Sequence, residues 1–106
     1  MPRMSRLRFP QDPQPSAGLG GAVRARRTAL GLSQSALAGR SDMDFSFVAE
    51  VDRGERNVTL PSLFRLAAGL GTTPGELVDD AHRALLAENA WYRDFVRQNA
   101  LGDGRD

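Results

Sequence analysis

The chain of 106 residues contains no cysteine, no lysine and a single histidine. Without cysteine it cannot form disulfides, iron–sulfur clusters, zinc fingers or a thiol nucleophile. One histidine cannot supply the two or three imidazoles of a usual metal site. No apolar run approaches the roughly 20 residues that span a bilayer, and the N-terminus lacks the apolar core of a secretory signal. We therefore expect a soluble cytoplasmic protein with no metal, no cofactor and no membrane partner.

The sequence also lacks the patterns that would indicate an enzyme. No nucleophile–base pair, metal cluster or phosphate loop is present. The glycine-rich stretch at residues 18–21 lacks the preceding strand and the lysine that a phosphate loop needs. We do not expect catalysis.

Positive charge is concentrated near the N-terminus. The formal net charge is +1, but residues 1–31 contain six arginines and one aspartate, and the remaining residues sum to −4. Residues 1–17 also hold four of the six prolines, which remove backbone donors and disfavour helix in the residue before them. Residues 1–17 are therefore predicted to be a flexible basic arm.

Residues 18–79 have the pattern of five short helices. β-Branched residues are sparse and no alternating run is sustained, so no strand is predicted. Residues that favour helix starts or stops divide the segment: Gly31, Ser33, Asp44, Gly54, Pro61 and Thr73. Residues 80–101 predict one additional helix, and residues 102–106 a frayed tail. The fold class is all-α.

The stretch from Leu32 to Leu60 has the spacing of a helix-turn-helix. Ala38 is small where two helices would cross closely, and Met43 would fill the space under the turn. Asp42 falls where the turn needs a residue that tolerates positive φ. These features lie on two short helices with one tight turn between them.

With these motifs the sequence resembles the XRE-type, phage repressor/Cro-like helix-turn-helix family. The resemblance runs from about Leu19 to Val78 and includes VRARRTALGLSQ, VDRGERN and LPSLFRLAAGLGTTPGELV. It implies a five-helix repressor-like domain, commonly dimeric, that places its third helix in the major groove of double-stranded DNA.

The resemblance also implies which residues contact DNA. Gln34 matches the glutamine that holds a backbone phosphate or braces a groove-facing side chain. The face of the third helix that meets base edges corresponds to Asp44, Phe45, Ser46, Ala49 and Glu50. The loop that grips phosphates corresponds to Arg53, Arg56, Asn57 and Thr59. The arm would reach the neighbouring groove or backbone with Arg3, Arg6 and Arg8.

The predicted groove face departs from the usual chemistry of base recognition. It offers no arginine or lysine for guanine and no asparagine or glutamine for adenine. Instead, Phe45 can contact thymine methyl groups, Glu50 can accept from a cytosine amino group, and Ser46 can bond to either kind of base edge. Residues 32–57 carry five acids and three arginines, a net charge of −2. In a complex with DNA this negative charge would face a polyanion.

The predicted C-terminal helix carries an apolar stripe with two interpretations. The stripe either completes the core of the single chain or forms a two-fold dimer contact. We favour the dimer, because aromatic residues are enriched at interfaces. The residues expected at this contact are Leu85, Trp91, Tyr92 and Phe95.

The sequence thus predicts a DNA-binding transcriptional regulator, a repressor that acts as a homodimer on a palindromic operator. A phage-type repressor, an antitoxin autoregulator and a restriction-system controller all fit its size. The alternative is a protein-interaction module on a helix-turn-helix scaffold with weak or no specific DNA binding.

Overall fold

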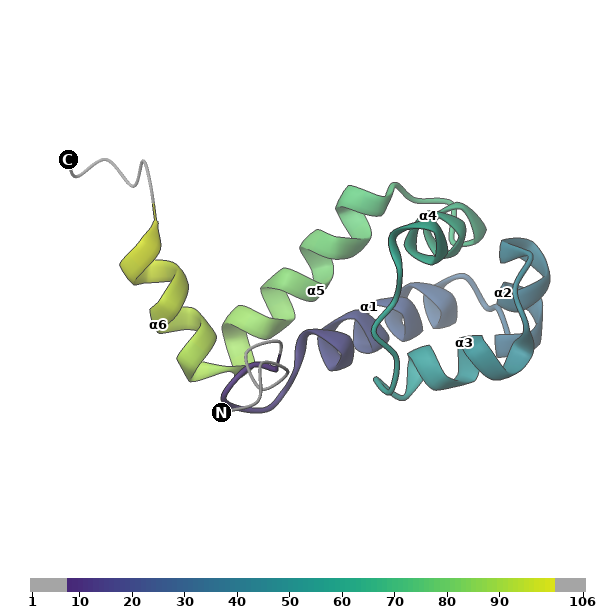
Figure 1. Cartoon of the computed structure of the whole chain (residues 1–106). Helices are drawn as coiled ribbons and strands as arrows, with labels where there is room; N and C mark the ends of the chain where they lie inside the picture. The colour runs from purple at the N-terminus through teal and green to yellow at the C-terminus, as the bar shows by residue number, and fades with distance from the viewer. Residues whose placement is uncertain (1–7, 101–106) are drawn as a thin grey trace.

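The computed structural model describes residues 8–100, in which all regular secondary structure is helical (Figure 1). Its elements are α1 (Pro15–Ala29), α2 (Gln34–Ser41), α3 (Phe45–Asp52), α4 (Leu60–Gly69), α5 (Pro74–Glu88) and α6 (Ala90–Asn99). The all-α class, with five helices and an additional C-terminal helix, is confirmed. The predictions for Arg3, Arg6 and the tail at 102–106 lie outside the described residues.

The residues that define the helix ends act as their chemistry suggests. The side chain of Ser33 accepts a hydrogen bond from the amide of Ala36 at 3.0 Å and so caps α2. Thr73 forms a reciprocal capping box with Glu76 at the start of α5. Asp42 adopts φ 55° between α2 and α3, which confirms the positive φ expected there.

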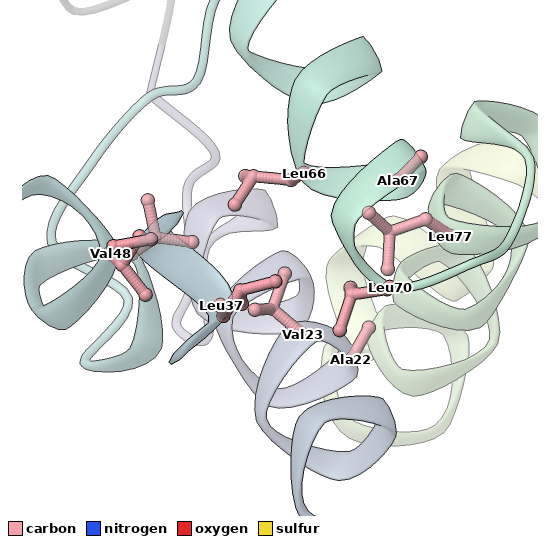
Figure 2. Close-up of a cluster of buried hydrophobic side chains, with 10 residues drawn as sticks. Ala22, Val23, Leu37, Val48, Leu66, Ala67, Leu70 and Leu77 are labelled. Carbon is pink, nitrogen blue, oxygen red and sulfur yellow. The ribbon is translucent and has the colours of Figure 1, made fainter. Parts of the chain in front are cut away.

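One apolar core joins the first five helices. Fully buried side chains come from each of them, as Figure 2 shows for most of the set: Val23, Leu37, Val48, Val51, Leu66 and Leu77. Burial of one such side chain stabilises the fold by about 1.5–3 kcal/mol. This core holds α2 and α3 at a fixed angle to each other.

Residues 9–14 are packed against the domain, although they belong to the segment that was predicted to be a flexible arm. Helix α1 begins at Pro15, and residues 9–14 lie against the start of α6 instead of extending away from the domain. Phe9 packs on the rings of Trp91 and Tyr92, with ring centroids 5.3 and 5.2 Å apart. Aromatic pairs of this kind contribute about 0.5–1.5 kcal/mol each beyond the area that they bury, which helps hold this non-helical segment in place.

The single helix expected at residues 80–101 is divided into two. Residues 80–88 complete α5, the backbone leaves the helical conformation at Asn89 (φ −111°, ψ 103°), and α6 follows. The side chain of Asn89 causes the break, because it caps α6 by accepting from the amide of Tyr92 at 2.8 Å. Helix α6 therefore turns away from the other five helices (Figure 1).

Candidate nucleic-acid interface

Helices α2 and α3 form a closed helix-turn-helix unit. The amide of Met43 donates to the carbonyl of Ala38 at 2.9 Å, and Met43 packs against the core under the turn. Ala38 is buried where the helices approach each other. The turn is therefore rigid, and it sets the direction in which α3 projects.

The predicted groove face of α3 is exposed mainly at its first turn. Asp44, Phe45 and Ser46 are exposed, and Phe45 is 52% exposed. Asp44 occupies the N-cap position, but its side chain makes no capping hydrogen bond. Ala49 is buried and Glu50 is half-buried, so less of the predicted groove face is exposed beyond the first turn of α3.

Both predicted phosphate-gripping arginines are paired with carboxylates. Arg53 donates to Glu55 at 3.0 and 3.1 Å. Arg56 donates to Glu50 at 2.6 Å and lies over the Phe47 ring, 5.1 Å from its centroid. The hydrogen bond from Arg53 lowers the pKa of the Glu55 carboxyl, and the same pair raises the pKa of Arg53.

The remaining loop residues lie at the surface of the same region. Asn57 is exposed. Thr59 is exposed as well and caps α4, with its hydroxyl accepting from the amide of Ser62. The loop follows the C-terminal end of α3, from which Arg56 reaches back to Glu50, and Thr59 already has a structural role as the cap of α4.

Gln34 is held by a buried acid. Its side-chain amide donates to Asp52 at 3.0 Å, and Arg27 donates to the same carboxylate oxygen at 2.6 Å. The Asp52 side chain is 1% exposed, and Arg24 donates to the Asp52 carbonyl at 3.1 Å. Sequence reasoning missed this network, although an acid directly after buried Val51 was its visible signal.

The residues expected at a dimer contact separate into two groups. Leu85 is buried within the single chain. The Tyr92 hydroxyl lies 3.1 Å from Nδ1 of His82, and its ring packs on Phe9, so it too has partners in its own chain. Trp91 and Phe95 stack on each other with centroids 4.9 Å apart, and Phe95 is 48% exposed.

Metal and membrane sites are absent from the described part of the chain. Between residues 8 and 100, no group of three or more histidine, aspartate or glutamate side chains is placed to hold a metal ion. Over the same residues, no helix combines the length and apolar character needed to cross a membrane.

Known proteins are similar to this chain in sequence and in fold. The helix-turn-helix family model HTH_3 matches residues 23–77. Control protein C.MunI from a Mycoplasma species is 35% identical over 60 residues, which are 57% of this chain and 81% of that protein.

Two solved structures extend the comparison. The restriction-modification controller protein C.AhdI from Aeromonas hydrophila is 45% identical with a TM-score of 0.57, over 58% of this chain and 94% of that chain. The clp gene regulator ClgR from Corynebacterium glutamicum is 25% identical with a TM-score of 0.69, over 83% and 93% of the two chains.

Proposed function

The chain belongs to the helix-turn-helix family HTH_3, and from this premise we propose that it is a DNA-binding transcriptional regulator, a dimeric repressor specific for one operator sequence. The observation that carries the proposal is the closed α2–turn–α3 unit with the first turn of α3 exposed. In such units the second helix lies in the major groove and its N-terminal residues contact base edges.

The exposed first turn of α3 determines which bases suit the groove face. The Phe45 ring offers an apolar surface to a thymine methyl group, and the hydroxyl of Ser46 can donate or accept. Glu50 accepts from a cytosine amino group. Asp44 disfavours base edges that present only acceptors, and Ala49, which is buried within the domain, offers no surface to a base.

The phosphate contacts come from the residues around α3. Asp52 holds one of the two N–H groups of the Gln34 amide, which leaves the other to donate to a phosphate. Arg53 and Arg56 reach phosphates when they exchange their carboxylate partners for the DNA backbone. Asn57 and Thr59 lie beside them and add neutral donors.

The relatives favour one biological setting among the three that fit the size of the chain. C.MunI is a control protein, and C.AhdI is a controller of a restriction-modification system. We therefore propose a restriction-system controller that acts on double-stranded DNA in the cytoplasm, at the nucleoid. Two copies on a palindrome would place their α3 helices about 34 Å apart, one helical turn of DNA.

Selection of bound sequences from a random duplex pool at two salt concentrations tests the proposal. We expect an enriched palindrome that survives the higher salt. Gln34→Ala and Ser46→Ala should weaken binding to that sequence while far-ultraviolet circular dichroism stays unchanged. The control variant Asp79→Asn, on exposed α5 surface, should bind as the parent chain does.

A second candidate function is a protein-interaction module, and the pairing of the loop arginines favours it. With Arg53 and Arg56 neutralised by Glu55 and Glu50, the surface around α3 offers little positive charge to a polyanion. Binding to DNA phosphates releases counterions, so it weakens as the salt concentration rises. If the chain does not bind DNA, or binds it with an affinity that does not depend on salt, this second candidate is favoured.

A further inference from the structure

Helix α6 lies outside the matched residues 23–77 and extends from the shared domain. C.AhdI is covered over 94% of its length by only 58% of this chain, so the shared domain is complete without such an addition. Figure 1 shows α6 directed away from the body of the molecule. Its main neighbour among the helices is α5.

The segment before α1 fixes the direction of α6. The side-chain amide of Asn89 is fully buried and donates to the carbonyls of Gln11 and Pro13 at 2.9 and 3.0 Å. The amide of Trp91 donates to the side chain of Gln11 at 3.0 Å. These bonds satisfy the first turn of α6 and turn the Tyr92 side of the helix inward.

Next to the Tyr92 side, α6 carries a stripe formed by Trp91, Phe95 and Gln98, in which Trp91 also packs on Phe9. Positions separated by four and seven residues lie on one face of a helix. The Trp91 and Phe95 rings stack almost parallel, at 14°, and Phe95 is about half exposed. A rigid, stacked aromatic pair at the surface is typical of the centre of an interface.

Two opposite charges border this stripe on the same edge. Successive helical residues are about 100° apart, which places Asp94 and then Arg97 beyond one edge of the aromatic stripe. They pair with each other at 3.1 Å, and their side chains are 57% and 68% exposed. The charges are therefore available to a partner that covers the stripe.

Two copies of α6 related by a two-fold axis complement each other. In an antiparallel pair of identical helices, equivalent edges face each other. With the axis between Phe95 and Val96, Asp94 of each copy lies opposite Arg97 of the second copy, and the two Phe95 rings meet at the centre. The stripe and its edge are thus self-complementary in both apolar surface and charge.

We propose that the α6 stripe is a self-association surface, on which α6 of a second copy docks antiparallel with Asp94 opposite Arg97. The proposal rests on the dimeric state proposed above and names the surface that forms it. The N-terminal segment has a defined part in it, since it holds α6 in the orientation that presents the stripe.

Charge reversal at two exposed positions of the full chain tests the surface and its register together. Asp94→Arg places arginine opposite arginine twice in a homodimer, and Arg97→Asp places acid opposite acid twice. Each variant alone should raise the dimer dissociation constant about tenfold in sedimentation equilibrium. An equimolar mixture of the two variants restores both opposite-charge pairs, and it should dimerise within about twofold of the parent chain.

The control and a second readout come from the same chain. Asp79→Arg, a charge reversal on exposed α5 surface, should leave the dissociation constant unchanged. Trp91 is the only tryptophan, so its emission should shift to shorter wavelength as the parent chain dimerises. The shift should be absent in each single variant at the same concentration and return in the mixture.

The outcomes separate this proposal from the proposed function. If the parent chain dimerises and the single variants dimerise equally well, or the mixture does not recover, the α6 surface is wrong while the dimer stands. If the parent chain stays monomeric throughout the concentration range, both the surface and the dimer are wrong. DNA recognition is judged independently by the selected sequences.

Discussion

At the scale of single residues, the buried carboxylate of Asp52 organises the surface around α3. It binds Arg27 from α1 and Gln34 from α2 through one oxygen, while its other oxygen has no hydrogen-bond partner in the structure. A buried charge that is removed from such a cluster leaves its partners unsatisfied. Asp52 therefore affects both the stability of the domain and the position of Gln34.

Asp52→Ala should lower the free energy of unfolding by about 3–5 kcal/mol, because it strands a largely buried arginine. Gln34→Ala removes one hydrogen bond to the same carboxylate and should cost about 1.5 kcal/mol. Urea denaturation followed by circular dichroism measures both. A loss below about 1 kcal/mol for Asp52→Ala would show that the arginine finds water or another partner.

The ion pair between Arg26 and Asp80 gives the fold a pH dependence. The hydrogen bond from Arg26, at 2.5 Å, holds the pKa of the Asp80 carboxyl below its ordinary value. A folded-state pKa that is depressed contributes stability above the unfolded pKa of about 3.9, and this stability is lost as the pH falls through the folded value.

The difference in unfolding free energy between the parent chain and Asp80→Asn should therefore be largest near neutral pH and shrink below about pH 4. Urea denaturation across a pH series measures it. Asp79→Asn removes the neighbouring carboxylate, which forms no ion pair among residues 8–100, and it should change stability less at neutral pH. Equal effects of the two substitutions would contradict the assignment.

At the scale of helices, the sequence was sufficient wherever a local signal decides the structure. Ser33, Asp42 and Thr73 act through backbone groups within four residues of themselves, so their positions predict the boundaries and the turn. Asn89 acts differently, because its partners Gln11 and Pro13 lie near the other end of the chain. No local pattern reveals such a contact, and the break between α5 and α6 was therefore missed.

The crossing of α1 and α3 also depends on a contact that is distant in sequence. A Cβ atom at Gly20 would collide with the carbonyl oxygen of Val51 and lie 3.0 Å from the amide of Gly54. A Cβ atom at Gly21 would meet no heavy atom within 4 Å. The close contact between α1 and α3 therefore requires glycine at position 20 but not at position 21, although both residues lie inside the same helix.

Gly20→Ala should destabilise the domain by about 1–3 kcal/mol, the usual cost of overpacking, because α1 must move away from α3. Gly21→Ala should stabilise it by up to about 1 kcal/mol, since alanine has the higher helix propensity. Thermal unfolding of the two variants measures both shifts. Shifts of the same sign would mean that the crossing tolerates a methyl group.

At the scale of the whole molecule, the sequence predicted the fold class and the family, but not which charges are free. A total of −2 over residues 32–57 shows that the region is acidic without showing which side chains meet. Folding brings Glu55 to Arg53 and Glu50 to Arg56. The partner of a surface arginine depends on tertiary geometry, and this choice decides how much positive charge DNA encounters.

Removal of one of these carboxylates should free its arginine partner to bind a phosphate of the DNA backbone. Glu55→Gln removes the acid that pairs with Arg53, so Arg53 can bind a phosphate without first giving up an ion pair. The affinity for the selected operator should rise several-fold at low salt, and the slope of log K against log salt should steepen by about one phosphate contact, roughly 0.9.

Titrations of labelled operator at several salt concentrations measure both quantities for the parent chain and for Glu55→Gln. Glu88→Gln, at the end of α5 and away from α3, removes the same charge and controls for the change in net charge alone. The two substitutions share any long-range effect on the polyanion, so only a local release of Arg53 makes their slopes differ. Equal slopes would place Arg53 away from the phosphates and would favour the interpretation of this surface as a protein-binding face.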